Sequence, residues 1–176
     1  MASTLTRQEA HDRARLLGVH AYRVDLDLTG GDTTFTSVST VAFSCSRAGA
    51  DSYIDLTARA VREIVLNGEP VPATAFDGDR ITLTGLRAEN KLRVVADCAY
   101  SRTGEGLHRF SDPADGAVYL YSDLETFDAH RVYACFDQPD LKATFELAVT
   151  APSGWQVVSN MAAAGDPAPA GEGIAR

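Results

Sequence analysis

Alternating apolar and polar residues run through most of this chain and predict a mainly β protein. Residues 21–29 place Tyr22, Val24 and Leu26 on one face and charged residues on the other. Successive side chains of a strand point to opposite faces, so this pattern predicts a strand buried on one side. Residues 35–45 alternate in the same way, and shorter runs separated by turn residues predict strands at 52–57, 61–66, 80–83, 91–100, 118–121, 144–150 and 155–159.

Turn residues separate these segments at short intervals. Asn67-Gly68 follows one apolar run directly and is a strong hairpin signal, and Asp77-Gly78-Asp79 predicts another turn. Closely spaced strands joined by hairpins favour a β-sandwich or open barrel with antiparallel or mixed sheets. We expect residues 103–116, which are rich in Gly, Asp and Pro, to form an ordered loop.

A short helix is expected before the first strand. Residues 7–17 carry a modest apolar stripe, Thr4 or Thr6 can cap the helix, and Gly18 is expected to end it. The region 1–160 is expected to form one domain. Residues 161–176, mostly small residues with Gly and Pro, are expected to form a flexible tail or linker.

The charge balance limits the classes of partner. The formal net charge is −8 with no basic stripe, so we expect no nucleic-acid partner. No apolar run approaches the roughly 20 residues that a membrane-spanning helix needs, and the N-terminus has no signal-peptide core. We therefore expect a cytoplasmic protein without a membrane partner. Cys45, Cys98 and Cys135 are then expected to be buried, reduced thiols, with a reactive Cys135 as the minor alternative.

Asp123 and Glu125 are the first candidates for chemistry. They follow an aromatic run that ends at Tyr121, and on an extended chain they would share a face. Two like charges there are costly unless a cation, a proton or a substrate amine lies between them. The pair could bind an amine or share a proton for acid–base catalysis. The alternative is a solvated pair, or partners for Arg109 and Arg131.

Other polar groups lie in the same block of the chain, residues 103–145. Glu105 and His108 occur in GEGLHR, and His130 occurs in DAHR. The segment FDQPDLKATF at 136–145 favours a rigid corner, with Lys142 and the neighbouring aspartates available to pin it. No HExxH motif occurs and no two histidines lie four apart on a helix, so no catalytic zinc is expected from this chain alone.

One long segment carries a family resemblance. The run YLYSDLETFDAHRVYACFDQPDLKATF resembles the N-terminal domain of M1-family zinc aminopeptidases. That family typically has Thr-Gln-Phe-Glu, then Asp-Ala-Arg-Arg, then Cys-Phe-Asp-Glu/Gln-Pro and Lys-Ala-Thr-Phe. The resemblance covers roughly residues 5–160 and implies a saddle-shaped β-sandwich that lies over a catalytic domain.

The resemblance also implies roles for individual residues. Glu125 matches the family Glu that binds the free α-amino group of the substrate. Asp123 stands where the family has a Gln that lines the pocket for the first side chain, and Ser122 replaces a Thr. The neighbouring block residues Tyr121, Glu105, His108 and His130 complete the candidate substrate-binding set.

Three functions follow from these observations. The first is an aminopeptidase N-terminal domain that binds the amino group of a peptide or a small amine-bearing substrate, with zinc supplied only by a separate M1-type catalytic domain. The second is a stand-alone, metal-independent enzyme in which Asp123 and Glu125 catalyse ring closure or elimination on an amino-acid derivative. The third is a non-catalytic binding module.

Overall fold

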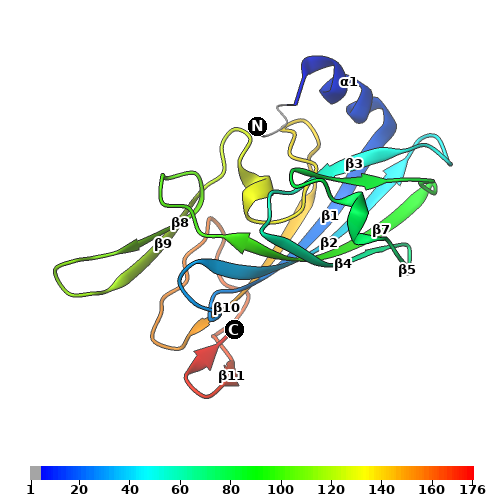
Figure 1. Cartoon of the computed structure of the whole chain (residues 1–176). Helices are drawn as coiled ribbons and strands as arrows, with labels where there is room; N and C mark the ends of the chain where they lie inside the picture. The colour runs from blue at the N-terminus through cyan, green and yellow to red at the C-terminus, as the bar shows by residue number, and fades with distance from the viewer. Residues whose placement is uncertain (1–4) are drawn as a thin grey trace.

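A mixed eight-stranded sheet forms the body of the molecule (Figure 1). The computed structural model describes residues 5–176. The strand order in the large sheet is β11-β12-β10-β1-β2-β7-β4-β5. These strands are β1 (Leu17–Asp27), β2 (Thr34–Cys45), β4 (Ala60–Leu66), β5 (Glu69–Pro70), β7 (Glu89–Ala99), β10 (Thr144–Pro152), β11 (Pro169–Gly171) and β12 (Ile174–Ala175).

The predicted mainly β fold with antiparallel and mixed sheets is confirmed. Strand β2 pairs antiparallel with both β1 and β7, whereas β1 pairs in parallel with β10. Phe35, Val41 and Phe43 of β2 are at most 1% exposed, as the alternation predicts. The Asn67-Gly68 turn joins β4 to β5, and both of its residues have positive φ angles, 56° and 87°, as a type I′ hairpin requires.

A second layer covers one face of the large sheet. Strands β3 (Ser52–Asp55) and β6 (Arg80–Leu83) pair antiparallel and form a separate two-stranded sheet. Ile54, Ile81 and Leu83 are fully buried and belong to the same core cluster as Phe43. Apolar side chains from the two layers therefore enclose one hydrophobic core. A 3-10 turn, η1 (Ala73–Ala75), precedes β6.

The predicted N-terminal helix is confirmed, but its end differs from expectation. Helix α1 (Arg7–Leu16) begins with a capping box between Thr6 and Glu9. Gly18 does not end the helix, because the chain passes directly into β1 at Leu17. A Cβ atom on Gly18 would lie 2.9 Å from Oγ of Ser44, so this glycine allows close packing against β2. Within residues 5–176, no helix is long and apolar enough to cross a bilayer.

Two local expectations were wrong. Residues 103–116 are not a loop throughout: β8 (Gly106–Ser111) pairs antiparallel with β9 (Val118–Asp123) in a hairpin that projects from the body (Figure 1). Residues 155–159, which are rich in apolar residues, do not form the expected strand. In the C-terminal region 161–176, β11 pairs with β12, and β12 pairs with β10. The division into a 1–160 domain and a tail stays a prediction.

Candidate functional site

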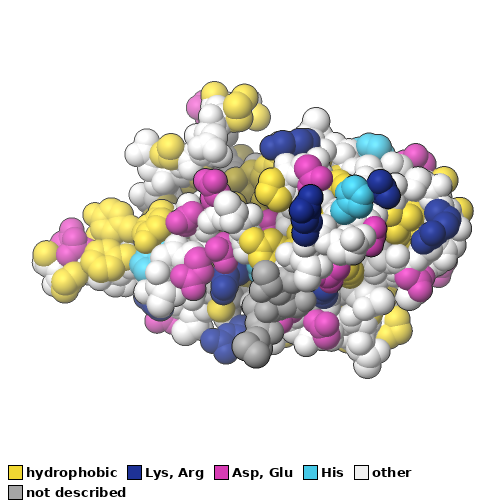
Figure 2. All heavy atoms as spheres, turned by 90° about the horizontal axis from the view of Figure 1, so that it is seen from above, with side chains coloured by type: hydrophobic (Ala, Val, Ile, Leu, Met, Phe, Trp, Pro, Cys, Tyr) yellow, Lys and Arg dark blue, Asp and Glu magenta, His cyan; other side chains and the backbone are white. Residues whose placement is uncertain are grey.

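The projecting hairpin brings two predicted site residues together. His108 of β8 lies opposite Tyr121 of β9, and their rings stack with centroids 4.8 Å apart. Phe110, Tyr119 and Tyr121 are each about half exposed. Figure 2 shows hydrophobic side chains gathered along this arm. The hairpin therefore presents an aromatic surface to solvent.

Asp123 and Glu125 lie at the base of this hairpin. Asp123 ends β9 opposite Gly106, and Glu125 lies in the turn that follows the strand. Because Glu125 lies outside the strand, the alternation of strand side chains does not place it on the same face as Asp123, as the sequence predicted. Both acids are exposed. The expected arginine partners bond elsewhere: Arg131 pairs with Asp128, and Arg109 donates to Oγ of Ser111 at 3.2 Å.

Glu105 lies in the loop before β8 and has a local partner. The hydroxyl of Thr103 donates to its carboxylate at 2.8 Å. A hydrogen bond from its own backbone N–H, and then the Thr103 hydroxyl, lower the pKa of Glu105. Glu105 lines a hollow of about 440 Å³ together with Arg59 and Arg131.

His130 is buried, unlike the exposed acids. It lies in the 3-10 turn η2 (Ala129–Arg131) and is 4% exposed. Its Nδ1 lies 2.7 Å from Oδ2 of Asp137, and its backbone N–H donates to the same oxygen at 3.1 Å. The Phe127 ring packs against the imidazole with ring centroids 4.6 Å apart and an interplanar angle of 46°. The fold therefore places His130 beneath the turn that bears Glu125.

The predicted rigid corner is pinned by buried residues. Gln138 accepts a hydrogen bond from Nε of Arg13 at 2.9 Å and donates to the backbone oxygen of Ala10 at 2.8 Å. The backbone N–H of Asp137 donates to Asp55 at 3.1 Å. Lys142, by contrast, is exposed. The corner is thus fastened to helix α1 and strand β3 by side chains other than the expected lysine.

Sequence reasoning missed the ionic contacts behind this corner. Arg13 of helix α1 is 3% exposed and lies 2.6 Å from Asp55. The guanidinium of Arg80 stacks on Tyr53 at 4.0 Å and lies 3.5 Å from Asp55. The sequence did contain a signal for the burial of Arg13. This residue lies next to Ala14 and three residues after Ala10, and both alanines belong to the apolar stripe of the helix.

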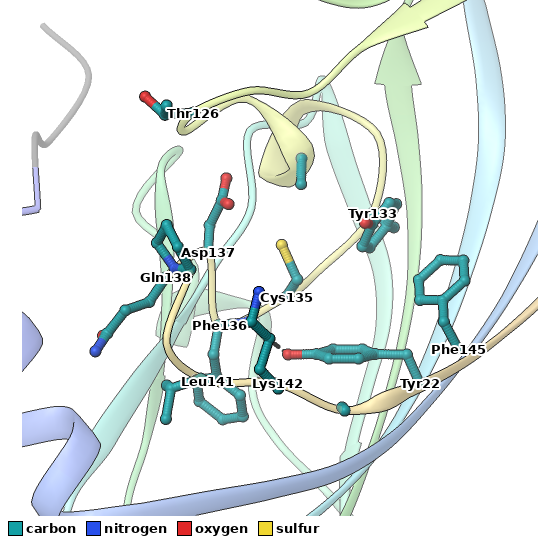
Figure 3. A pocket seen from close by; sticks show the side chains of 13 residues that line it. Tyr22, Thr126, Tyr133, Cys135, Phe136, Asp137, Gln138, Leu141, Lys142 and Phe145 are labelled. Carbon is teal, nitrogen blue, oxygen red and sulfur yellow. Dashed lines mark hydrogen bonds between the residues drawn. The ribbon is translucent and has the colours of Figure 1, made fainter. Parts of the chain in front are cut away.

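A small pocket of about 240 Å³ opens beside the corner (Figure 3). Four aromatic side chains line it, and so does Thr126, which directly follows Glu125. Cys135 contributes its thiol to the wall, but burial and then the charge of Asp137 raise the pKa of that thiol well above its usual range. A thiol held protonated is a poor nucleophile, so the reactive-cysteine alternative has no support. The aromatic side chains are Tyr22, Tyr133, Phe136 and Phe145.

The chain shows no metal centre in the described part. Across residues 5–176, no group of three or more His, Cys, Asp and Glu side chains is placed to hold a metal ion. Three protein ligands are the usual minimum for catalytic zinc. The side chains present therefore do not fit a zinc site.

Comparison with known proteins decides the family. A family profile described as the Peptidase M1 N-terminal domain matches residues 19–171. This chain belongs to the M1 peptidase N-terminal domain family. The M1 domain described here is 54% identical over 162 residues to aminopeptidase N of Streptomyces lividans, covering 90% of this chain and 19% of that protein.

More distant relatives agree with this assignment. Human aminopeptidase N is 25% identical, with 96% of this chain and 20% of the human protein covered. The crystal structure of Legionella pneumophila aminopeptidase A with aspartic acid matches the M1 domain with a TM-score of 0.65 at 14% identity. That match covers 77% of this chain and 16% of the Legionella chain, and it supports the fold. The M1 domain thus spans about a fifth of the length of the curated relatives it matches most fully.

Proposed function

We propose that this M1 N-terminal domain supplies Glu125 to bind the free α-amino group of a peptide substrate. The observation that carries the proposal is that, among residues 5–176, the Glu125 carboxylate has no hydrogen-bond or ion-pair partner. Two other acids of the block have intramolecular partners, because Asp128 pairs with Arg131 and Asp137 with His130. Glu125 is exposed at the base of the hairpin. A substrate ammonium is a chemically suitable partner for its carboxylate.

The contact would orient the substrate rather than cleave it. A carboxylate and an ammonium form a short, charge-assisted hydrogen bond, which fixes the N-terminal end of a peptide. The exposed Asp123 lies two residues away and adds negative charge, which further favours a cationic ligand. A zinc ion held by an M1-type catalytic domain would supply the Lewis acid, since the described residues of this chain do not form a site for it.

The proposal extends to the protein partner, the substrate and the cellular location of this domain. The catalytic domain is the expected protein partner, because the related aminopeptidases are about five times longer than the matched segment. A peptide with a free N-terminus is the expected substrate. A cytoplasmic location accords with the three unpaired, buried cysteines.

The stand-alone enzyme gains no support, because neither Asp123 nor Glu125 lines either hollow described above.

A chimeric enzyme tests the amine contact. This chain would replace the matching N-terminal segment of Streptomyces lividans aminopeptidase N, with which it shares 54% identity. Activity would be measured with an aminoacyl 4-nitroanilide. Because a hydrogen bond to a charged group contributes about 1.5–3 kcal/mol, Glu125→Gln should lower kcat/KM about 10- to 150-fold.

The matched control is Glu89→Gln, which changes another exposed glutamate, near His20. It should leave kcat/KM within about twofold. Equal kcat/KM values for the Glu125→Gln chimera and the parent chimera would refute the amine-binding role. An inactive parent chimera with a full complement of zinc would instead contradict the assignment of this domain to such an enzyme.

A further inference from the structure

The turn that bears Glu125 has a buried support. Residues 124–128 leave β9 and enter η2, and the backbone N–H of Asp128 closes the turn on the carbonyl of Leu124 at 3.2 Å. The side chain of Glu125 is exposed to solvent. Phe127, two residues later, packs its ring on His130. The position of Phe127 therefore limits how far the Glu125 backbone can move.

His130 is itself held by hydrogen bonds at its ring, its backbone N–H and its carbonyl. Asp137 accepts hydrogen bonds from its ring and from its backbone N–H, and the backbone N–H of Thr57 donates to its carbonyl at 2.8 Å. A carboxylate can only accept, so the ring proton lies on Nδ1. The two backbone contacts hold the main chain of His130 and the Nδ1 contact orients its imidazole, against which the Phe127 ring packs at a tilt of 46°.

Asp137 is in turn anchored to the core. Its backbone N–H donates to Asp55, and Asp55 is bound by the guanidinium of Arg13 at 2.6 Å. Asp137, Asp55 and Arg13 are all less than 9% exposed. A continuous series of buried polar contacts therefore leads from helix α1 to His130, and the contact between the rings of His130 and Phe127 joins it to the exposed turn.

We propose that His130, oriented by Asp137, is a positioning residue that holds the turn bearing Glu125 in place for the substrate ammonium. This inference rests on the proposed amine-binding role of Glu125. His130 is too buried to contact a substrate itself, and it acts through Phe127. The contact matters because a displacement of about 1 Å in a binding group can cost a large part of the rate.

A double-mutant cycle in the chimera tests the inference. His130→Leu keeps an apolar surface and removes the ring N–H, and it should lower kcat/KM about 10- to 100-fold, mainly through KM. In a Glu125→Gln background the same change should have little further effect, because the group it positions is already lost. A purely structural role would reduce kcat/KM equally in both backgrounds, and that result would overturn the inference.

Two further variants keep the test decisive. His130→Arg restores a flat donor, the residue of the family's Asp-Ala-Arg-Arg run, and should recover kcat/KM to within about threefold of the parent. If His130→Leu does not fold, Phe127→Leu removes the stacked ring while the His130–Asp137 pair stays intact, and it should show the same dependence on Glu125. Additive losses for Phe127→Leu and Glu125→Gln would then overturn the inference.

The two proposals fail in different ways. If Glu125→Gln has no effect, the amine-binding role fails. If Glu125→Gln is costly while His130→Leu is harmless or additive, only the positioning role fails. Amide 15N relaxation of the 176-residue chain adds a direct readout. His130→Leu should increase fast motion at residues 124–128 and leave β1 and β2 unchanged, whereas unchanged relaxation at 124–128 would contradict the inference.

Discussion

Arg13 and Asp55 form an ion pair in which the guanidinium and the carboxylate lie 2.6 Å apart and both side chains are 2% exposed. Burial raises the pKa of Asp55, and the neighbouring guanidinium of Arg13 opposes that rise. The pair joins helix α1 to strand β3. Through Gln138 and Asp137 it also fastens the corner that supports η2.

Removing the guanidinium should be strongly destabilising. Arg13→Met leaves Asp55 without its closest cation, so the free energy of unfolding should fall by about 3–5 kcal/mol. Urea denaturation of the 176-residue chain measures this loss. Arg23→Met is the matched control, because Arg23 pairs with Glu146 at an exposed position and should cost less than about 1 kcal/mol. Similar losses for the two variants would contradict the importance of the buried pair.

The helix cap predicts a pH-dependent contribution to stability. Hydrogen bonds from the backbone N–H and hydroxyl of Thr6, with a smaller effect of Arg80, lower the pKa of Glu9 from 4.5 to about 2. The folded protein thus favours ionised Glu9, whose contribution is complete above about pH 4.5 and declines as the pH falls toward 2. Glu9→Ala should therefore cost about 1 kcal/mol at pH 7 and less at pH 3.

Urea denaturation between pH 3 and pH 7 checks the Glu9 prediction. Glu9→Gln serves as the control, since the amide can still accept a hydrogen bond from Thr6 but does not titrate in this range. The difference in stability between Glu9→Gln and Glu9→Ala should stay constant with pH. A cost of Glu9→Ala that does not change with pH would disprove the role of the carboxylate charge.

The aspartate at position 123 should influence substrate preference. In the chimera, its carboxylate should favour a substrate whose first side chain is cationic. Asp123→Gln, which restores the family amide, should lower the ratio of kcat/KM for arginyl over alanyl 4-nitroanilide about tenfold, or about 1.4 kcal/mol. Asp115→Asn, at an exposed position in the tip of the hairpin, should leave the ratio unchanged. An unchanged ratio for Asp123→Gln would place Asp123 outside the first side-chain pocket.

Metal content provides an independent check. The purified 176-residue chain should hold well under one zinc per chain by elemental analysis, because its described residues lack a cluster of three ligands. The chimera, which includes the catalytic segment of the Streptomyces enzyme, should hold about one zinc per chain. A tightly bound, stoichiometric zinc in the 176-residue chain would refute this prediction.

Local sequence patterns predicted the elements whose own residues define them. β2 alternates regularly, and its apolar residues are buried because one face packs on the core. The Asn67-Gly68 turn was predictable because few residues adopt positive φ angles readily. The β8–β9 hairpin was only half predicted. Its β8 half, 106–111, lies in a stretch rich in Gly, Asp and Pro, and much of its apolar surface is exposed, so no clear buried face marks it.

Other features depend on segments that are distant in sequence. The composition of residues 155–159, with Trp155 and two valines, favours a strand. A strand needs a neighbour to satisfy its backbone groups, however, and this segment is not in a ladder. β1 lies parallel to β10, which follows more than 100 residues later. The burial of Arg13 depends on Asp55 and Gln138, each contributed by a separate segment.

The sequence by itself determined the mainly β class, most strand positions and the resemblance to M1 aminopeptidases, because these depend on residue periodicity and on one long motif. Only the tertiary structure decided which motif residues are exposed and which are buried. Glu125 and His130 lie five residues apart, yet one faces solvent and the other is held beneath it by Asp137. The reason is that burial depends on which distant segments pack around a residue, and a local pattern does not record those neighbours.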